Sequence, residues 1–313
     1  MTNPARPFRF SVTVPTTTSG SAWRDTARRA EDLGFSVLVT ADHLADCLPP
    51  LPPLVAAAEA TTALRVGTLV VNNDLHHPVV LAREAAAVDL LTDGRLELGL
   101  GAGHAEPEYV QAGIRFDPVA TRVERLAEAV AVIRGLLDGE ELEFQGRHYQ
   151  VRGHRLSPGP VQQPVPILVG GNGRAVLRLA ARAADIVGMS GTGRTNPDGQ
   201  THQATGFPAE VVGERVALVR EAAGDRFDQL ELNALVQAVI VTENRRAAAE
   251  RVRRRLPELS VEQILGTPYL LIGTVDQMVE QLHHQRERFG FTYYSLFEPA
   301  MAAVAPLIGR LRA

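Results

Sequence analysis

Residues 65–101 read RVGTLVVNNDLHHPVVLAREAAAVDLLTDGRLELGLG and contain one complete strand-helix-strand unit. Two runs rich in β-branched and apolar residues, Arg65–Val71 and Arg95–Leu100, flank the alanine-rich segment Pro78–Leu91, whose apolar positions have helical spacing. The proline that opens this segment suits the first turn of a helix, and an Asp-Gly turn precedes the second strand. Both strands are almost continuously apolar, which is typical of a parallel sheet covered on both faces.

The same alternation continues in both directions along the chain. The predicted strands are Phe8–Val14, Phe35–Thr40, Arg65–Val71, Arg95–Leu100, Pro166–Val169, Asp185–Met189, Glu231–Val241 and Phe291–Phe297. The predicted helices are Ala22–Leu33, Pro53–Ala63, Pro78–Leu91, Ala120–Leu137, Gly173–Ala184, Pro208–Ala223, Arg245–Leu256 and Val275–Phe289. Such a series most simply closes into an α/β (β/α)₈ TIM barrel with the helices outside. A doubly wound open sheet is the alternative that the pattern leaves open.

Two insertions interrupt this order. Glu141–Arg152, after the fourth helix, is predicted to form a small hairpin that turns at a Gln-Gly pair. Ser190–Gly206, after the sixth strand, is a polar and glycine-rich loop, and loops of this length in compact domains usually serve function. The chain of 313 residues shows no repeat beyond the strand-helix unit, so we expect one barrel domain over residues 1–313.

Composition excludes several classes of partner and chemistry. The 32 basic and 36 acidic residues give a net charge of -4, which argues against nucleic acid as a partner. Every basic residue is an arginine, so catalysis through a lysine Schiff base is excluded and a phosphate must be held by arginine or backbone N–H groups. Cys47 is the single cysteine, which fits a reducing cytoplasm, and no apolar run of about 18 residues predicts a membrane span.

Residues that directly follow the strands are the candidates for chemistry, because barrel active sites lie at the carboxyl ends of the strands. Asp42 and His43 follow the second strand. A histidine beside a carboxylate can polarise a carbonyl group or move a proton. The alternative is an aspartate that caps the next helix beside an uninvolved histidine. His76 and His77 are the other obvious metal ligands, but adjacent histidines rarely bind one ion together, so no metal site is predicted.

Asparagines and glycines follow the third and fourth strands. Asn72–Asp74 either form a turn through side-chain to backbone bonds or present amides to a planar heterocycle. The alternating glycines of Gly99–Gly103 indicate that something approaches the backbone closely, and a flat floor beneath a ring system is the functional interpretation of Gly101 and Gly103. Glu108, shortly after them, either closes one side of a pocket or, more commonly at such a position, caps a helix.

The loop after the fifth strand is the most specific local signal. Its glycines permit a tight turn, the N–H groups at the following helix start attract an anion, and an arginine adds positive charge. A phosphate is therefore expected at Gly170, Gly171, Asn172, Gly173 and Arg174. The alternative is a glycine-rich loop without a ligand. In the insertion after the sixth strand, Gly191, Thr192 and Arg194 are candidates for a second wall of the phosphate site, with a mobile loop tip as the equal alternative.

Six short motifs occur in an order shared with one known family. They are Asp42–Leu44, Val66–Thr68, Asp93–Arg95, Gly99–Gly103, Phe144–Tyr149 and Ile167–Gly171. Together they resemble the luciferase-like oxidoreductases, also called the luciferase-like monooxygenase family. The likeness runs from about Phe10 to Phe297, which is nearly the whole chain.

Members of that family bind flavin mononucleotide (FMN) or the deazaflavin coenzyme F420, and the Asp-His pair resembles the F420 branch. The resemblance implies an enzyme, a homodimer, that transfers a hydride between F420 and a small organic substrate. Three alternatives remain open at this point. They are an FMN-dependent monooxygenase that uses molecular oxygen, a flavin-binding barrel without turnover, and a metal-dependent hydrolase on the same fold.

The resemblance also assigns roles to matched residues. It implies a non-prolyl cis peptide near Leu69 and Val70 beneath the central ring, and it places Asn72 at the ring edge. Some relatives hold the phosphate with a lysine, and because this chain has none, Arg174 or Arg194 is expected to take its place. As a hypothesis, His43 moves the proton that accompanies the hydride and is oriented by Asp42.

Overall fold

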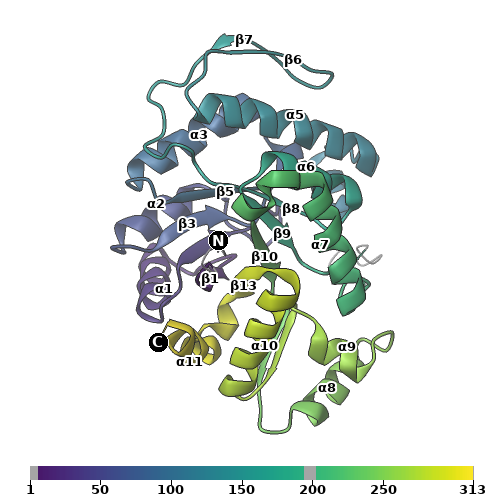
Figure 1. The fold of residues 1–313 in the computed structure, drawn as a ribbon. Coiled ribbons are helices and arrows are strands. Elements are labelled where there is room, and N and C mark those ends of the chain that lie inside the picture. The colour runs from purple at the N-terminus through teal and green to yellow at the C-terminus, as the bar shows by residue number, and fades with distance from the viewer. Residues whose placement is uncertain (1–5, 194–201, 313) are drawn as a thin grey trace.

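The computed structural model describes residues 6–193 and 202–312, in which the strands form a closed parallel barrel (Figure 1). The barrel strands are β1 (Arg9–Thr13), β2 (Val37–Thr40), β3 (Arg65–Thr68), β5 (Leu96–Gly101), β8 (Ile167–Gly170), β9 (Ile186–Met189), β10 (Glu231–Leu235) and β13 (Phe291–Phe297). They lie in the order β3-β2-β1-β13-β10-β9-β8-β5, and β3 pairs with β5 to close the ring. This closure confirms the predicted (β/α)₈ barrel and excludes the open sheet.

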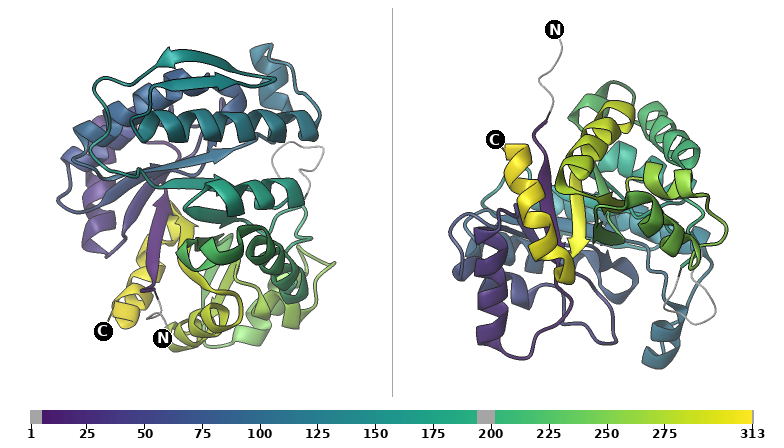
Figure 2. Two further views of the ribbon diagram at one scale, coloured as in Figure 1. Left: turned by 45° about the horizontal axis from the view of Figure 1, so that its top comes forward. Right: turned by 90° about the horizontal axis from the view of Figure 1, so that it is seen from below.

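Helices surround the barrel and join its strands. They are α1 (Gly20–Asp32), α2 (Pro52–Glu59), α3 (Pro78–Leu91), α5 (Val119–Leu137), α6 (Arg174–Ala183), α7 (Ala209–Ala223), α10 (Val275–Phe289) and α11 (Met301–Arg312). Figure 2 shows the first strand, β1 in purple, beside the last, β13 in yellow, with Arg9 opposite Tyr293 and Thr13 opposite Phe297. None of the described helices is both long and apolar enough to span a membrane.

Side chains alternate between two separate cores, because successive residues of a strand point to opposite faces. One set packs between the sheet and the helices and includes Phe10, Val12 and Val66. The other fills the barrel and consists of Val37, Val39, Leu168, Ile186 and Tyr293, with Leu69 and Val70 packed against it. The barrel is therefore a filled core rather than a pore, as expected for this fold.

An ion-pair network closes the amino-terminal end of the barrel. The Arg9 guanidinium donates to both carboxylate oxygens of Glu231 and, at 2.6 Å, to Glu97. It also lies 3.8 Å from the centre of the Tyr293 ring. Arg65 donates a further hydrogen bond of 2.8 Å to Glu97. Since these residues belong to β1, β3, β5, β10 and β13, they join strands from around the ring.

The predicted hairpin lies outside the barrel and the structure adds a third insertion, while residues 194–201 of the predicted loop Ser190–Gly206 lie outside the described residues. The hairpin is formed by β6 (Leu142–Gln145) and β7 (Gln150–His154), which lie above α5 in Figure 1. The third insertion corrects the prediction of one strand over Glu231–Val241: the segment splits into β10 and β11 (Ala238–Val241), and β11 pairs outside the barrel with β12 (Leu270–Gly273). Eleven consecutive strand residues exceed the usual strand length of about 5–6, which is the physical reason for the split.

The sequence pattern missed three of the described α-helices, two of them short. They are α4 (Glu106–Ala112), α9 (Val261–Gly266) and, at the end of the chain, the longer α11. The helix predicted over Arg245–Leu256 forms as α8 (Arg245–Arg253). The strand predicted over Arg65–Val71 is also interrupted, since β4 (Val71–Asn72) follows β3 after a break at Leu69 and Val70.

Candidate active site

The candidate residues of four neighbouring strands lie side by side at the carboxyl edge of the barrel. The backbone N–H of Asn72 donates to Asp42 Oδ2 at 2.9 Å. Asn72 pairs with Gly101 in the ladder between β4 and β5. The next strand along the ring is β8, which pairs with β5 and ends at Gly170. Directly after it, the N–H of Gly171 donates to Gly188 O in β9. The residues expected to form one cradle therefore follow a continuous edge.

Leu69 and Val70 form an apolar layer on top of the barrel interior. The peptide bond between them is cis, as the family resemblance implied. Both side chains are half-buried and pack on the inner core, and the N–H of Leu69 donates to Thr40 O at 2.7 Å. Because the remaining part of these side chains is open, they offer a small apolar surface at the mouth of the barrel.

The glycines after the fourth strand have a different neighbour from the one expected. A Cβ atom on Gly99 would lie 2.0 Å from Thr68 O, and one on Gly101 would lie 2.5 Å from Val70 Cγ2. The close approach that these glycines indicated is thus made by the chain itself. Their role in this structure is to let residues 68–70 sink toward β5, which places the Leu69–Val70 layer.

Tyr109, in α4, connects the glycine segment with the asparagine turn. Its hydroxyl donates to Asn72 Oδ1 at 3.0 Å and lies 3.2 Å from Asp74 Oδ2. A Cβ atom on Gly103, whose φ is +73°, would lie 1.9 Å from this hydroxyl. Burial raises the pKa of Tyr109 to about 12, so the phenol stays protonated and remains a donor. With Asn72 Oδ1 occupied, Nδ2 is the part of that side chain without a hydrogen bond among the described residues.

The hypothesis that Asp42 orients His43 is wrong in this structure. Asp42 Oδ2 lies 2.8 Å from His76 Nε2 and also accepts from Asn72 N. His43 Nδ1 instead lies 2.7 Å from Glu108 Oε1. Although the two residues are adjacent, their side chains meet different segments: Asp42 contacts residues 72–76 after β3, and His43 contacts α4.

Glu108 is a functional candidate that the sequence pattern interpreted mainly as a helix cap. Besides His43, its carboxylate accepts the backbone N–H of Leu44 at 3.1 Å, so it holds the whole turn after β2. A carboxylate at Nδ1 favours the imidazole tautomer that carries its proton there and leaves Nε2 as an acceptor. The pair therefore has the arrangement of a base and its orienting group.

Three imidazole rings lie in a row beside this pair. The ring centres of His43 and His104 are 5.4 Å apart, and those of His104 and His202 are 5.1 Å apart, both in edge-on contact. Desolvation of the ring, with the charges of His43 and His202, lowers the pKa of His104 to about 4, although the residue keeps an exposed surface. His104 is therefore neutral at pH 7. In the described part of the chain no group of His, Cys, Asp and Glu is placed to hold a metal ion.

Asn172 ties together the two loops expected to bind phosphate. Its Nδ2 group donates to Ser190 Oγ at 2.7 Å and lies 3.4 Å from Thr192 Oγ1, and its Oδ1 accepts the N–H groups of Ser190 and Gly191. The side chain is thus engaged with protein, and the loop continues to Gly173, the residue that caps the start of α6. A Cβ atom on Gly173 would meet nothing within 4 Å, so the backbone is open at this residue, whereas a Cβ atom on Gly171 would lie 2.7 Å from Val176 Cγ1.

Arg215, in α7, reaches this cradle and was not among the predicted residues. Its Nη1 lies 3.4 Å from Asn172 Oδ1, and a Cβ atom on Gly206 would lie 2.0 Å from the same nitrogen. Arg174, the predicted cation, is exposed at the first position of α6. Arg194 falls outside the described residues. Arg215 gave no sequence signal, because it lies inside a predicted helix that is far from any strand end.

Comparison with known proteins gives a family and a fold. Residues 6–304 match the family described as luciferase-like monooxygenase. An uncharacterized protein of Mycobacterium tuberculosis is 34% identical over 171 residues, which cover 54% of this chain and 53% of that protein. The alignment thus spans about half the length of that curated relative. An F420-dependent glucose-6-phosphate dehydrogenase of Nakamurella multipartita is 32% identical over 250 residues, covering 77% of this chain and 70% of that enzyme.

The barrel also matches solved structures. A coenzyme F420 dependent tetrahydromethanopterin reductase from Methanopyrus kandleri superimposes with a TM-score of 0.75 over 96% of this chain and 98% of the reductase, at 17% sequence identity. At this identity the likeness shows the shared fold.

Proposed function

Because the chain belongs to the luciferase-like monooxygenase family, we propose that it is an oxidoreductase that transfers a hydride between coenzyme F420 and a small organic substrate. The observation that carries this proposal is the His43–Glu108 pair, which stands at the same barrel edge as the apolar Leu69–Val70 layer. Hydride transfer to a carbonyl, or from an alcohol, requires two components: a planar cofactor ring and a group that transfers the proton.

The residues present suit a tricyclic ring with a phosphate tail. Leu69 and Val70 offer an apolar surface to the face of a ring, and the Nδ2 group of Asn72 is available to its polar edge. The open backbone at Gly173, where α6 begins, suits a phosphate, because N–H groups at a helix start attract anions. When bound, F420 supplies the carbon that gives or receives the hydride.

The chain's own residues position the substrate and move the proton. His43 Nε2, left as an acceptor by the Glu108 bond, takes the proton of an alcohol as its hydride departs, or returns it in the reverse direction. Glu108 keeps the imidazole in one orientation and stabilises its charged form. His104, neutral at pH 7, offers a hydrogen bond beside them without adding charge.

Parallel titrations with F420 and FMN test the cofactor. We expect F420 to bind at least about tenfold more tightly than FMN, a difference of about 1.4 kcal/mol in binding free energy. Fluorescence quenching of each cofactor measures both affinities under the same conditions. Tighter binding of FMN, or FMN retained through purification, would instead favour the monooxygenase that uses molecular oxygen.

Replacing Arg215 by glutamine is expected to weaken F420 binding about tenfold, because a charge-assisted hydrogen bond to phosphate contributes about 1.5–3 kcal/mol. The matched variant Arg174→Gln removes the same charge from the exposed start of α6 and is expected to change the affinity less than about threefold. Titration with the deazaflavin core lacking its phosphate tail completes the test, because neither variant should alter that affinity. A larger loss in Arg174→Gln than in Arg215→Gln contradicts the assignment.

A further inference from the structure

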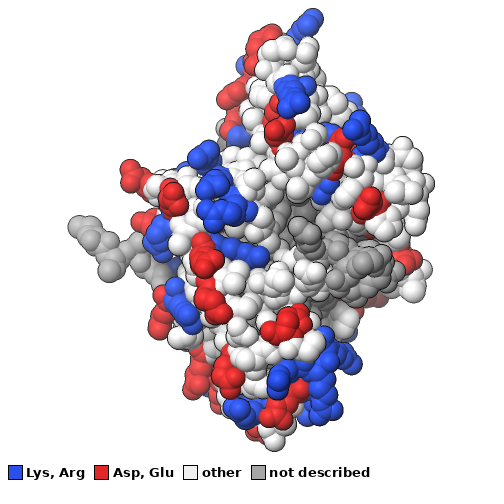
Figure 3. Space-filling view, turned by 90° about the vertical axis from the view of Figure 1, so that its right-hand side faces the viewer, with Lys and Arg blue, Asp and Glu red and all other residues white. Residues whose placement is uncertain are grey.

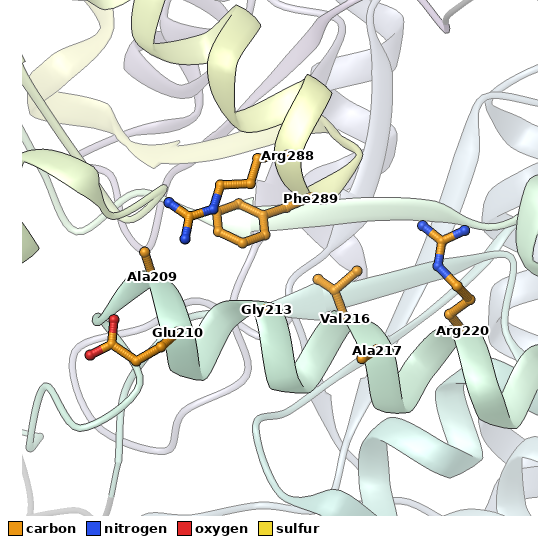
Figure 4. A pocket seen from close by; sticks show the side chains of 8 residues that line it. All are labelled: Ala209, Glu210, Gly213, Val216, Ala217, Arg220, Arg288 and Phe289. Carbon is orange, nitrogen blue, oxygen red and sulfur yellow. The ribbon is translucent and has the colours of Figure 1, made fainter.

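Two cavities among the described residues lie outside the barrel mouth. The larger, of about 320 Å³, lies between α7 and α10 and is shown in Figure 4. Arg220 and Arg288 flank it, but both are exposed, and each packs on a phenylalanine ring, at 4.0 Å on Phe227 and 4.9 Å on Phe289. No described residue that lines this groove has a buried polar atom without a partner. It therefore gives no indication of a ligand.

The second cavity, of about 220 Å³, lies between the third insertion and the barrel helix α10. Residues of α8 and α9, both in that insertion, line it together with residues of α10. Arg245 lies on one side of it and donates through Nη2 to Gln281 Oε1 at 3.0 Å and to Leu265 O at 3.3 Å. Both acceptors are uncharged, and the Nε–H of Arg245 is buried without a partner in the described structure. Burial lowers the pKa of Arg245, opposed only by the charge of Glu280.

Arg245 forms no ion pair among the described residues and is less exposed than the arginines that follow it in α8. Basic and acidic side chains gather together at the lower part of the face in Figure 3, over α8 and α9. There Arg246 lies 3.4 Å from Glu262 and 3.9 Å from Glu250, and the cluster Arg253–Arg255 is exposed to solvent. Arg245 is turned inward, and within the described residues it forms no ion pair. A half-buried guanidinium whose hydrogen-bond acceptors are neutral favours an anionic ligand.

An acceptor faces the same cavity from α10. Gln285 is 1% exposed and donates through Nε2 to Gly266 O at 2.7 Å, while its Oε1 is buried without a partner among the described residues. Glu280, on the same helix, is exposed at the rim. The cavity is thus lined by the positive charge of Arg245, the amide of Gln285 and the carboxylate of Glu280, whose charge also acts on Arg245.

We propose that this cavity binds a small α-amino acid, with its carboxylate on Arg245 and its ammonium group on Gln285 Oε1 and toward Glu280. A zwitterion complements both charges, whereas phosphate would meet the Glu280 carboxylate. The half-buried Leu265 adds an apolar contact for a short aliphatic side chain. The volume suits such a small molecule, since it is below the about 300 Å³ at which drug-sized sites begin.

Calorimetric titration of the full chain with three molecules that share the same branched alkyl group tests the proposal. L-valine carries both charged groups, 3-methylbutanoate lacks the ammonium group, and 2-methylpropylamine lacks the carboxylate. We expect L-valine to bind at least about tenfold more tightly than either analogue, because each loses one charge-assisted contact. Absence of L-valine binding, or equal binding of 3-methylbutanoate or inorganic phosphate, overturns the proposal.

Two variants locate the binding in this cavity, and a third serves as the control. Glu280→Gln is expected to weaken L-valine binding about threefold, because an exposed charge partner contributes little to the binding free energy. Gln285→Met keeps the length of the side chain, removes the buried acceptor, and is expected to weaken binding about tenfold. Glu287→Gln removes a charge from an exposed position of α10 outside the cavity and should leave the affinity unchanged. Equal effects of Glu287→Gln and Glu280→Gln, with folding verified by circular dichroism, contradict the assignment.

Discussion

Replacing His43 by alanine is expected to lower turnover about 100-fold or more while changing the affinity for F420 less than about threefold, because proton transfer by a positioned group contributes 10²–10⁴-fold to rate. A 100-fold loss corresponds to about 2.7 kcal/mol of transition-state stabilisation. The cofactor affinity is spared because the apolar layer of Leu69 and Val70 and the cradle at the start of α6 do not include His43. Turnover and affinity are measured on the same preparation.

Two further variants separate proton transfer from a general disturbance of the site. Glu108→Gln keeps an oxygen near His43 Nδ1 but removes the charge, so turnover is expected to fall about tenfold. His104→Ala disturbs the row of imidazole rings without removing the base, and turnover is expected to stay within about tenfold of the unmodified protein. Unchanged turnover in His43→Ala refutes its role.

Gly99→Ala is expected to destabilise the fold by about 3 kcal/mol or more, since overpacking between strands typically costs 1–3 kcal/mol and this contact cannot relax through a flexible side chain. The added Cβ would lie 2.0 Å from Thr68 O. Two hydrogen bonds also fix Thr68 against Gly99: the Thr68 hydroxyl donates to Gly99 O and accepts from Gly99 N, each at 2.8 Å. Urea unfolding followed by circular dichroism measures the change in free energy.

Gly159→Ala provides the matched control for this substitution. A Cβ atom on Gly159 meets nothing within 4 Å, and its backbone is not in the left-handed region. The free energy of unfolding is therefore expected to change by no more than about 0.5 kcal/mol, as for ordinary surface substitutions. If the two variants unfold at the same urea concentration, β3 and β5 are not as closely apposed as described.

Local signals explain why the barrel strands and the long helices could be predicted. Pro78–Leu91 was predicted with the same bounds as α3, because a proline at the start and an Asp-Gly turn near the end are encoded in the immediate sequence. The short strand β12 was missed although a signal exists: four apolar residues precede the capping box of Thr274 and Gln277. Its partner β11 could not be assigned from sequence, because that pairing depends on tertiary contacts.

The same limit applies to the candidate site. The strand-end rule identified the correct edge of the barrel, but not the partners along it. His43 and Glu108 are 65 residues apart in the chain, and Arg215 is 43 residues from Asn172. Contacts at these separations leave no periodicity or spacing that a single sequence could show. The prediction for the turn after β2 was wrong because it assumed that neighbours in the chain interact. Asp42 and His43 are adjacent but bind different partners.

The arginine and glutamate network at the amino-terminal end of the barrel has a kinetic consequence. Arg9 bridges Glu97 and Glu231 beneath the filled interior, so the described barrel residues leave the opposite opening as the route for the reactants of the proposed function. A ring resting on Leu69 and Val70 would lie below any substrate that reaches His43. Under the proposed function we therefore expect a compulsory order, in which the cofactor enters first and is released last.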